Sequence, residues 1–190
     1  MNLVGTAAMI LCTALAISLA VAADVAPVAT NSCLAAGDGT LQARVRGAID
    51  ADINWNNSQM SCEGGMRPDR KGVRVTLAGP MPKDANGARI RFVFGIAMKD
   101  AAAGVAQALP TNLTIILEGQ QQLFSTRGDN KCAVEQFDVT PLLAHGPGAG
   151  KQRVHARGYC TGPASDLQGT QRVLVSTFDF TSQINSGDEP

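Results

Sequence analysis

The sequence has few of the side chains on which hydrolytic and metal chemistry depends. Its 190 residues contain two histidines and neither a G-x-S-x-G nor an H-E-x-x-H motif. A structural zinc site uses four ligands, mostly Cys and His, and many serine hydrolases and metalloproteases carry one of these motifs. His145 lies in a Gly/Pro-rich loop, and His155 alternates with arginines along a predicted strand. The sequence therefore predicts no catalytic residue, no metal site and no cofactor.

Aromatic residues and net charge are scarce as well. The chain has one Trp, one Tyr and six Phe, and its 16 basic residues balance its 16 acidic residues. A neutral chain has no general attraction for nucleic acid or for an anionic membrane, so neither is an expected partner. Trp55 shares the parity of apolar neighbours, which predicts packing in the core first and a role as a glycan-stacking platform only second.

One long apolar run is present, at the amino terminus. No charged residue occurs from Leu3 to Ala23, and the run contains the small residues Ala20-Val21-Ala22 near its end. This pattern predicts a signal peptide, residues 1–22, that is cleaved after Ala22 or Ala23. The alternative is a retained membrane anchor of about 20 residues. Because no other run is long enough, the mature protein is predicted to have no membrane span and to be exported, periplasmic or extracellular. Abundant Ala and a preference for Arg over Lys favour a bacterial source.

The cysteines that follow this run are Cys33, Cys62, Cys132 and Cys160. An even number in an exported chain predicts two disulfides. If the segments that Cys132 opens and Cys160 closes form a hairpin, the numbers of opposed residues sum to 292, which centres the turn at residue 146 in a Gly/Pro-rich segment. The spacing therefore favours Cys132–Cys160 and, by elimination, Cys33–Cys62. A crossed connectivity is the alternative, since four cysteines allow three pairings.

The same register predicts a charged pair. It sets Glu135 opposite Arg157 on one face of the sheet, where opposite charges stabilise an antiparallel pair by roughly 0.2–1 kcal/mol. It also sets Phe137 opposite His155, which mixes apolar and basic residues on one face. A β-bulge in either strand would restore the alternation and would break the pairing of Glu135 with Arg157.

Alternation of apolar and polar residues dominates the rest of the chain. From Leu41 to Trp55 it predicts one half-buried strand with a bend or bulge near Gly47. Seven shorter segments follow, separated by clusters of Gly, Pro, Asn and Asp. They lie at residues 72–79, 88–98, 112–119, 121–127, 132–139, 152–160 and 171–180. Only residues 97–109 have a helix-like composition.

These patterns predict one all-β domain over residues 40–190, with a short polar tail at its carboxyl end and an irregular leader at residues 23–39. An antiparallel two-sheet sandwich of about eight strands, jelly-roll-like, is the preferred architecture. A closed β-barrel is the alternative.

Two polar motifs have simple structural interpretations. Asp50 to Asn54 begins like a calcium-binding loop, but Trp55 and Ser61 stand where that loop needs Gly and Glu. It is therefore predicted to be the exposed face of a strand, and a surface ion held by Asp50 and Asp52 together with other loops is the alternative. The turn at residues 65–74 is predicted to be a solvated hairpin, although its charge suits a phosphate or an acidic sugar. Its basic residues are Arg67, Arg70, Lys71 and Arg74.

The tripeptide Arg127-Gly128-Asp129 has the sequence of an adhesion tag. Gly128 permits a positive φ, and Asp129 and Asn130 favour turns, so a turn between two strands is the first interpretation. A local binding rim is the second, and adhesion is a distant third.

For function, the sequence favours an exported, disulfide-stapled, non-catalytic module that binds a protein or a glycan in the envelope or outside the cell. Its candidate binding residues are Glu118, Arg127, Asp129 and Arg157. The alternative is a small secreted hydrolase of polysaccharide or peptidoglycan, which needs two convergent carboxylates. Candidates for these are Glu118, Asp129, Glu135 and Asp138.

Overall fold

The computed structural model describes residues 32–82, 87–98, 108–142 and 150–185 of the chain. These residues form eleven β-strands, all paired antiparallel, and contain no helix, which confirms the predicted all-β class. In this part of the chain no helix is therefore long and apolar enough to cross a membrane. The predicted signal peptide, the polar tail at residues 186–190 and most of the helix-like segment lie outside the described residues.

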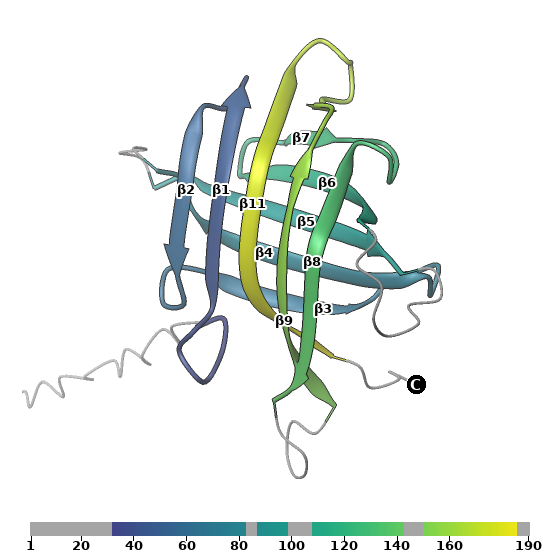
Figure 1. Ribbon diagram of the computed structural model, residues 1–190. Coiled ribbons are helices and arrows are strands. Elements are labelled where there is room, and N and C mark those ends of the chain that lie inside the picture. Colours follow the sequence, from purple (N-terminus) through teal and green to yellow (C-terminus); the bar gives the residue numbers. More distant parts are fainter. Residues whose placement is uncertain (1–31, 83–86, 99–107, 143–149, 186–190) are drawn as a thin grey trace, which may run out of the picture.

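Five strands form the layer that faces the viewer in Figure 1, called the front layer below. Their order in the layer is β2-β1-β11-β9-β8. They are β1 (Thr40–Gly47), β2 (Ala51–Asn56), β8 (Cys132–Pro141), β9 (Lys151–Cys160) and β11 (Arg172–Asn185).

Five further strands form the back layer, in the order β7-β6-β5-β4-β3, so that neighbours in sequence are also neighbours in space. They are β3 (Ser61–Met66), β4 (Gly72–Pro80), β5 (Arg89–Ala97), β6 (Leu109–Glu118) and β7 (Gln122–Ser125). The strands of the two layers cross at a steep angle (Figure 1), as in an orthogonal sandwich. The short β10 (Ala164–Ser165) pairs with β11 and β7, and β8 also pairs with β6, so the layers are joined along one side.

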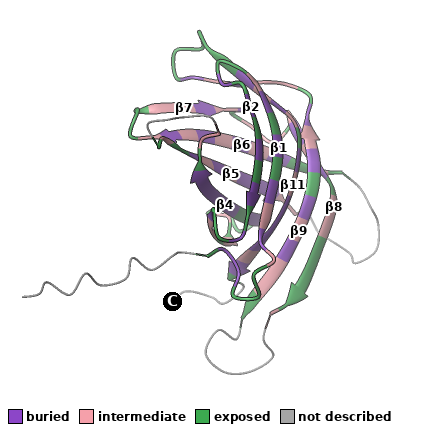
Figure 2. Cartoon of the chain, turned by 90° about the vertical axis from the view of Figure 1, so that its left-hand side faces the viewer, coloured by how far each residue is buried: buried purple, intermediate pink, exposed green. Residues whose placement is uncertain are grey.

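The core lies between the layers. Buried and exposed residues alternate along the front strands (Figure 2), as a half-buried sheet requires. Phe94 of the back layer packs against Phe178 and Phe180 of β11, with ring centroids 4.7 and 5.0 Å away. Trp55 is 3% exposed, lies edge-on to Phe92 and donates a hydrogen bond from Nε1 to the Pro80 carbonyl at 3.0 Å. The predicted burial of this tryptophan is confirmed.

The structure corrects the prediction of one long strand from Leu41 to Trp55. The segment is a hairpin, because the chain reverses after Gly47, whose φ is +117°, and Leu41 lies opposite Trp55. In this register odd-numbered residues oppose odd-numbered residues, so the apolar parity continues through the turn and imitates a single strand. The sequence also missed β3, which is rich in glycine, and the two-residue β10. Eleven strands therefore replace the eight that were predicted.

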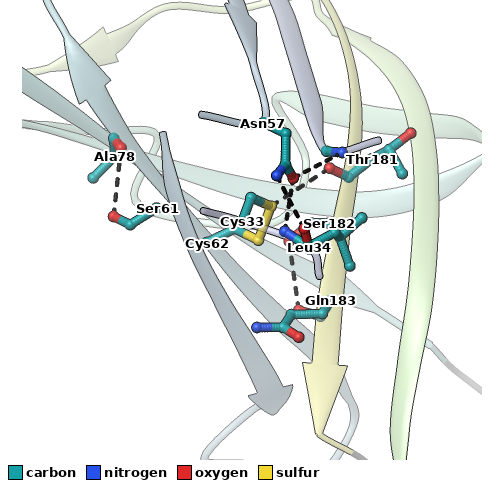
Figure 3. The surroundings of a disulfide bond; sticks show 10 residues. Cys33, Leu34, Asn57, Ser61, Cys62, Ala78, Thr181, Ser182 and Gln183 are labelled. Carbon is teal, nitrogen blue, oxygen red and sulfur yellow. Dashed lines mark hydrogen bonds between the residues drawn. A yellow bond between two sulfur atoms is a disulfide. The ribbon is translucent and has the colours of Figure 1, made fainter. Parts of the chain in front are cut away.

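Both predicted disulfides are present, Cys33–Cys62 and Cys132–Cys160. Cys132 lies directly opposite Cys160 in the pairing of β8 with β9, as the hairpin prediction required. The first disulfide ties the segment that precedes β1 to β3 (Figure 3). Leader residues near Cys33 therefore belong to the core, because Cys33 itself is only 1% exposed.

Candidate functional site

Glu118 is the last residue of β6, and its carboxylate is bound by two arginines. Its carboxylate accepts hydrogen bonds from Arg89 Nε at 3.1 Å and from Arg91 Nε and Nη2 at 2.9 and 2.6 Å. Partial burial raises the pKa of Glu118, but the hydrogen bonds and charges of Arg91 and Arg89 outweigh it, so the pKa lies below its usual value. This carboxylate thus clamps β5 to β6.

The Arg127-Gly128-Asp129 tripeptide forms a turn between β7 and β8, as predicted. Arg127 has a φ of +53° and donates from Nη2 to the carbonyls of Asp166 and Leu167 at 2.8 and 2.9 Å. Arg127 therefore holds the loop after β10. Its guanidinium is engaged within the protein, which argues against a role in adhesion.

Asp129, at the other end of the tripeptide, holds a different loop. Its carboxylate accepts from Arg67 Nη1 at 3.1 Å and from Asn112 Nδ2 at 2.8 Å. Arg67 belongs to the basic turn between β3 and β4, and its side chain is only 13% exposed. The predicted solvated turn thus has one arginine that is largely buried and ion-paired, while Arg70 and Arg74 are exposed.

Arg157 differs from the other three predicted binding residues. It is exposed on β9, and among the described residues the side chains of Arg157 and Glu135 have neither a hydrogen-bond partner nor an ion-pair partner. The predicted pairing of these two residues is wrong, because β8 has a bulge between Val134 and Gln136 and the latter lies opposite Arg157. Glu135 is the extra residue of the bulge. Both side chains still line the same hollow.

The bulge also changes the pairing around His155. Asp138 lies opposite His155, and Phe137 lies opposite the buried Ala156. Phe137 and His155 therefore no longer share one face of the sheet, as they did in the predicted register. The cause is a bulge, which the sequence analysis gave as the alternative. A bulge places an additional side chain on one face of a strand and re-aims those that follow.

The hollow lined by Arg157 and Glu135 has a volume of about 360 Å³ and lies on the outer face of the front layer. It is lined by residues of all five front strands, from Asp52 of β2 through Arg44 of β1 and Asp179 of β11 to the unpaired pair on β9 and β8. The hollow therefore runs across the strands and not along them.

A second bulge lies beside this hollow, in β11. Arg44 opposes Thr177 and Val45 opposes Val175, so that Ser176 is the extra residue. The two bulges are in strands that flank β9, and both interrupt the ladder next to lining residues of the hollow. Bulges are over-represented next to functional sites, which makes this face the strongest candidate.

Most other charges on the outer face are paired with one another. His155 Nε2 lies 3.0 Å from Asp179 Oδ1, and its Nδ1 lies 3.6 Å from Asp138 Oδ2. Arg153 pairs with Asp38 of the segment before β1. A second hollow, of about 420 Å³, continues past His155 along β9. The free guanidinium of Arg157 and the free carboxylate of Glu135 thus stand among satisfied charges.

The carboxylates proposed for a hydrolase are divided between the layers. Glu118 lies on the back layer, Asp129 lies in a turn, and Glu135 and Asp138 lie on β8. A general acid needs a raised pKa, whereas the pKa of Glu118 is lowered. In the described ranges, no group of three or more His, Cys, Asp or Glu side chains is placed to hold a metal ion.

Sequence reasoning found Arg157 as a binding candidate of the hollow, and it named Glu135 as a carboxylate and Asp52 as a possible ligand of a surface ion. It missed Arg44, Thr177 and Asp179. Their alternation marks them as outward-facing, but only the pairing of β1 with β11 and of β11 with β9 brings them beside Arg157. No family model, curated protein or solved structure matches the chain. The case for a function therefore depends on this geometry.

Proposed function

We propose that the protein is an exported, non-catalytic binding module that binds its partner on the outer face of the front layer. One observation carries the proposal: a hollow crosses five strands, two bulges adjoin it, and the side chains of Arg157 and Glu135 line it without a partner in the part of the chain that the structure describes. Leaving such groups unpaired in the free protein keeps them available to a ligand, since hydrogen bonds to charged groups are the stronger ones.

Export is supported by the two disulfides, which indicate an oxidising environment, and by the apolar run that precedes Asp24. The envelope or the outside of the cell is the compartment that fits both features.

The hydrolase alternative has less support. Its carboxylates are spread over two layers and a turn, and Glu118 and Asp129 each serve as a clamp between neighbouring segments. Glu135 and Asp138 share a strand, but Asp138 lies close to the His155 ring, which also contacts Asp179. No pair of these carboxylates is placed as a hydrolase requires, with one protonated as the general acid and the other ionised beside the same substrate.

The test is co-sedimentation of the mature protein with cell-envelope fractions. Arg157→Ala should lower the bound fraction by roughly tenfold, because it removes a hydrogen-bonding charge from the hollow. Arg74→Ala is the matched control: Arg74 is also exposed and lies on β4 of the back layer. Equal binding by both variants would contradict the proposed surface, and release of soluble sugar from the envelope would favour the hydrolase.

A further inference from the structure

We infer that the partner of this face is a linear, uncharged polysaccharide that lies in the hollow across the five front strands. The inference rests on the proposed function and adds the chemical class of the ligand. The shape of the hollow, its charges and the hydrogen-bonding groups of the face support this class of ligand.

The shape favours an extended ligand. Neighbouring strands lie about 4.8 Å apart, so four steps from β2 to β8 span roughly 19 Å. The hollow is lined along this whole path, from Asp52 on β2 to Glu135 on β8. A short stretch of a linear chain fits a shallow path of this length, whereas a compact small molecule would use only part of it.

The charge balance favours an uncharged ligand. Asp52 lies 2.8 Å from Arg46 and 3.9 Å from Arg44, and Asp179 Oδ1 lies 3.0 Å from His155 Nε2, so these groups already have partners within the face. Of the charged groups that line the hollow, the guanidinium of Arg157 and the carboxylate of Glu135 are the two without a partner among the described residues. The lining as a whole has two arginines and three carboxylates, and a difference of one charge is too small to select a polyanion or a polycation.

The free groups suit hydroxyls. A guanidinium presents a planar fork of donors, and a carboxylate presents two acceptor oxygens, so each can bind two neighbouring hydroxyl groups of a sugar. Gln42 and Thr177 add an amide and a hydroxyl to the same lining. Tyr159, half-buried at the hollow, provides an aromatic ring for the apolar side of a sugar. Trp55 is not available for this role because it is buried in the core.

The backbone of the face does not suit an extended peptide. The strands β1, β11 and β9 are paired on both sides over most of the hollow, and the ladder between β11 and β9 ends at Phe178 and Gly158, next to Thr177 and Tyr159. A peptide laid across them would find a continuous row of free main-chain groups on none of these strands, and most of its own buried amides would lack partners. A polysaccharide has no such obligatory backbone groups and can bind through side chains alone.

The experiment is affinity electrophoresis of the mature protein in gels that contain one defined polysaccharide each. The uncharged probes are hydroxyethyl cellulose, mixed-linkage β-glucan, glucomannan and dextran, and the charged probes are polygalacturonate and heparin. At least one uncharged probe should retard the protein. Raising NaCl from about 50 to about 500 mM should change its apparent Kd by less than roughly twofold, because an uncharged ligand makes no ion pair that salt could screen.

Variants assign the binding to the hollow. Arg157→Ala and Glu135→Gln should each weaken the binding of that probe by roughly tenfold or more, and Arg74→Ala should leave it unchanged. The emission maximum of Trp55, which should be blue-shifted because the indole is buried, checks that each variant is folded.

The outcomes separate the ligand class from the proposed function. If only the charged probes bind, or if none of the six binds while Arg157→Ala still lowers co-sedimentation with envelope fractions, the uncharged polysaccharide is wrong and the binding face stands. If Arg157→Ala changes neither measurement, both the ligand class and the face are wrong.

Discussion

At the residue scale, the side chain of Asn57 holds the segment that precedes β1 in the core. Its Oδ1 accepts from the backbone N–H groups of Leu34 and Gly39 at 2.7 and 3.0 Å, and its Nδ2 donates to the Leu34 carbonyl at 2.9 Å. Figure 3 shows Asn57 beside the Cys33–Cys62 disulfide. A buried amide thus replaces the strand pairing that this segment lacks.

Asn57→Ala should therefore destabilise the protein. The substitution leaves two backbone N–H groups without an acceptor, and each unsatisfied group costs about 1–3 kcal/mol. Urea unfolding measures the loss as a lower midpoint. Asn54→Ala, on the exposed face of β2, is the control and should change the free energy of unfolding by less than about 0.5 kcal/mol. Equal midpoints for both variants would show that the amide contributes nothing.

Glu118→Gln should lower stability in a pH-dependent way. The folded pKa of Glu118 lies below its ordinary value of 4.5, so its ion pairs stabilise the folded state above that pH. As the pH falls through the lowered folded pKa, the carboxylate is protonated and this contribution is lost. Because the arginines are partly exposed, the gap between variant and wild type at pH 7 should be only about 1 kcal/mol.

Denaturant unfolding at a series of pH values from neutral to strongly acidic measures this gap. It should close below the ordinary carboxyl pKa. A gap that persists unchanged in acid would mean that Glu118 acts through packing and not through its charge.

At the scale of the elements, the bulge in β8 decides what the front layer presents to solvent. Because of the extra residue, Phe137 lies opposite the buried Ala156, and Glu135 and Gln136 lie next to Arg157. One inserted residue therefore reconciles the core with the outer face.

Deleting Glu135 should remove the bulge without unfolding the hairpin. Val134, Gln136 and Phe137 would then follow the regular alternation, and Cys132 would still oppose Cys160. The protein should keep its disulfide and its buried Trp55 emission but lose envelope binding. Glu135→Ala, which keeps the backbone bulge, should lose less. If the deletion binds as well as wild type, the bulge has no part in the site.

The Cys132–Cys160 disulfide stabilises the same hairpin at its open end. The cysteines are 28 residues apart in sequence. The double substitution Cys132→Ser and Cys160→Ser should lower the free energy of unfolding by about 3–4 kcal/mol, because the unfolded chain regains loop entropy. Urea unfolding of both proteins without reductant measures this difference in the free energy of unfolding. A loss below about 1 kcal/mol would contradict this entropic contribution.

At the scale of the whole molecule, the two crossed layers depend on contacts between distant segments. Trp55 of β2 lies over Gly79 of β4, where an added Cβ would come within 2.7 Å of the indole ring. Gly64 of β3 likewise leaves room for Gln183 and Ile184 of β11. The absence of side chains at these two glycines lets the layers approach.

The mature molecule is expected to begin near Ala23 or Asp24. The reason is the uncharged run that contains Ala20-Val21-Ala22, and the disulfides fit an oxidising compartment. Amino-terminal sequencing of the exported protein measures the start. A full-length product that remains in the membrane fraction would contradict cleavage and favour the anchor.

The sequence by itself determined which way most side chains face. Residues such as Ile90, Phe92 and Phe94 alternate with polar or smaller neighbours, and all three are fully buried. It also favoured the Cys132–Cys160 pairing over the crossed alternative, since a hairpin centred on the Gly/Pro-rich segment sets these two cysteines opposite each other. Both are local properties, because the side-chain period of two belongs to the strand itself.

Only the tertiary structure decided which strands are neighbours. Leu41 to Trp55 alternates equally well as one strand or as a hairpin, and the choice depends on packing against β11 and the back layer. The bulge at Glu135 was one of two registers that the sequence allowed. The candidate site required Arg44, Asp179 and Arg157 to meet, and their strands are brought together by long-range pairing that no local pattern encodes.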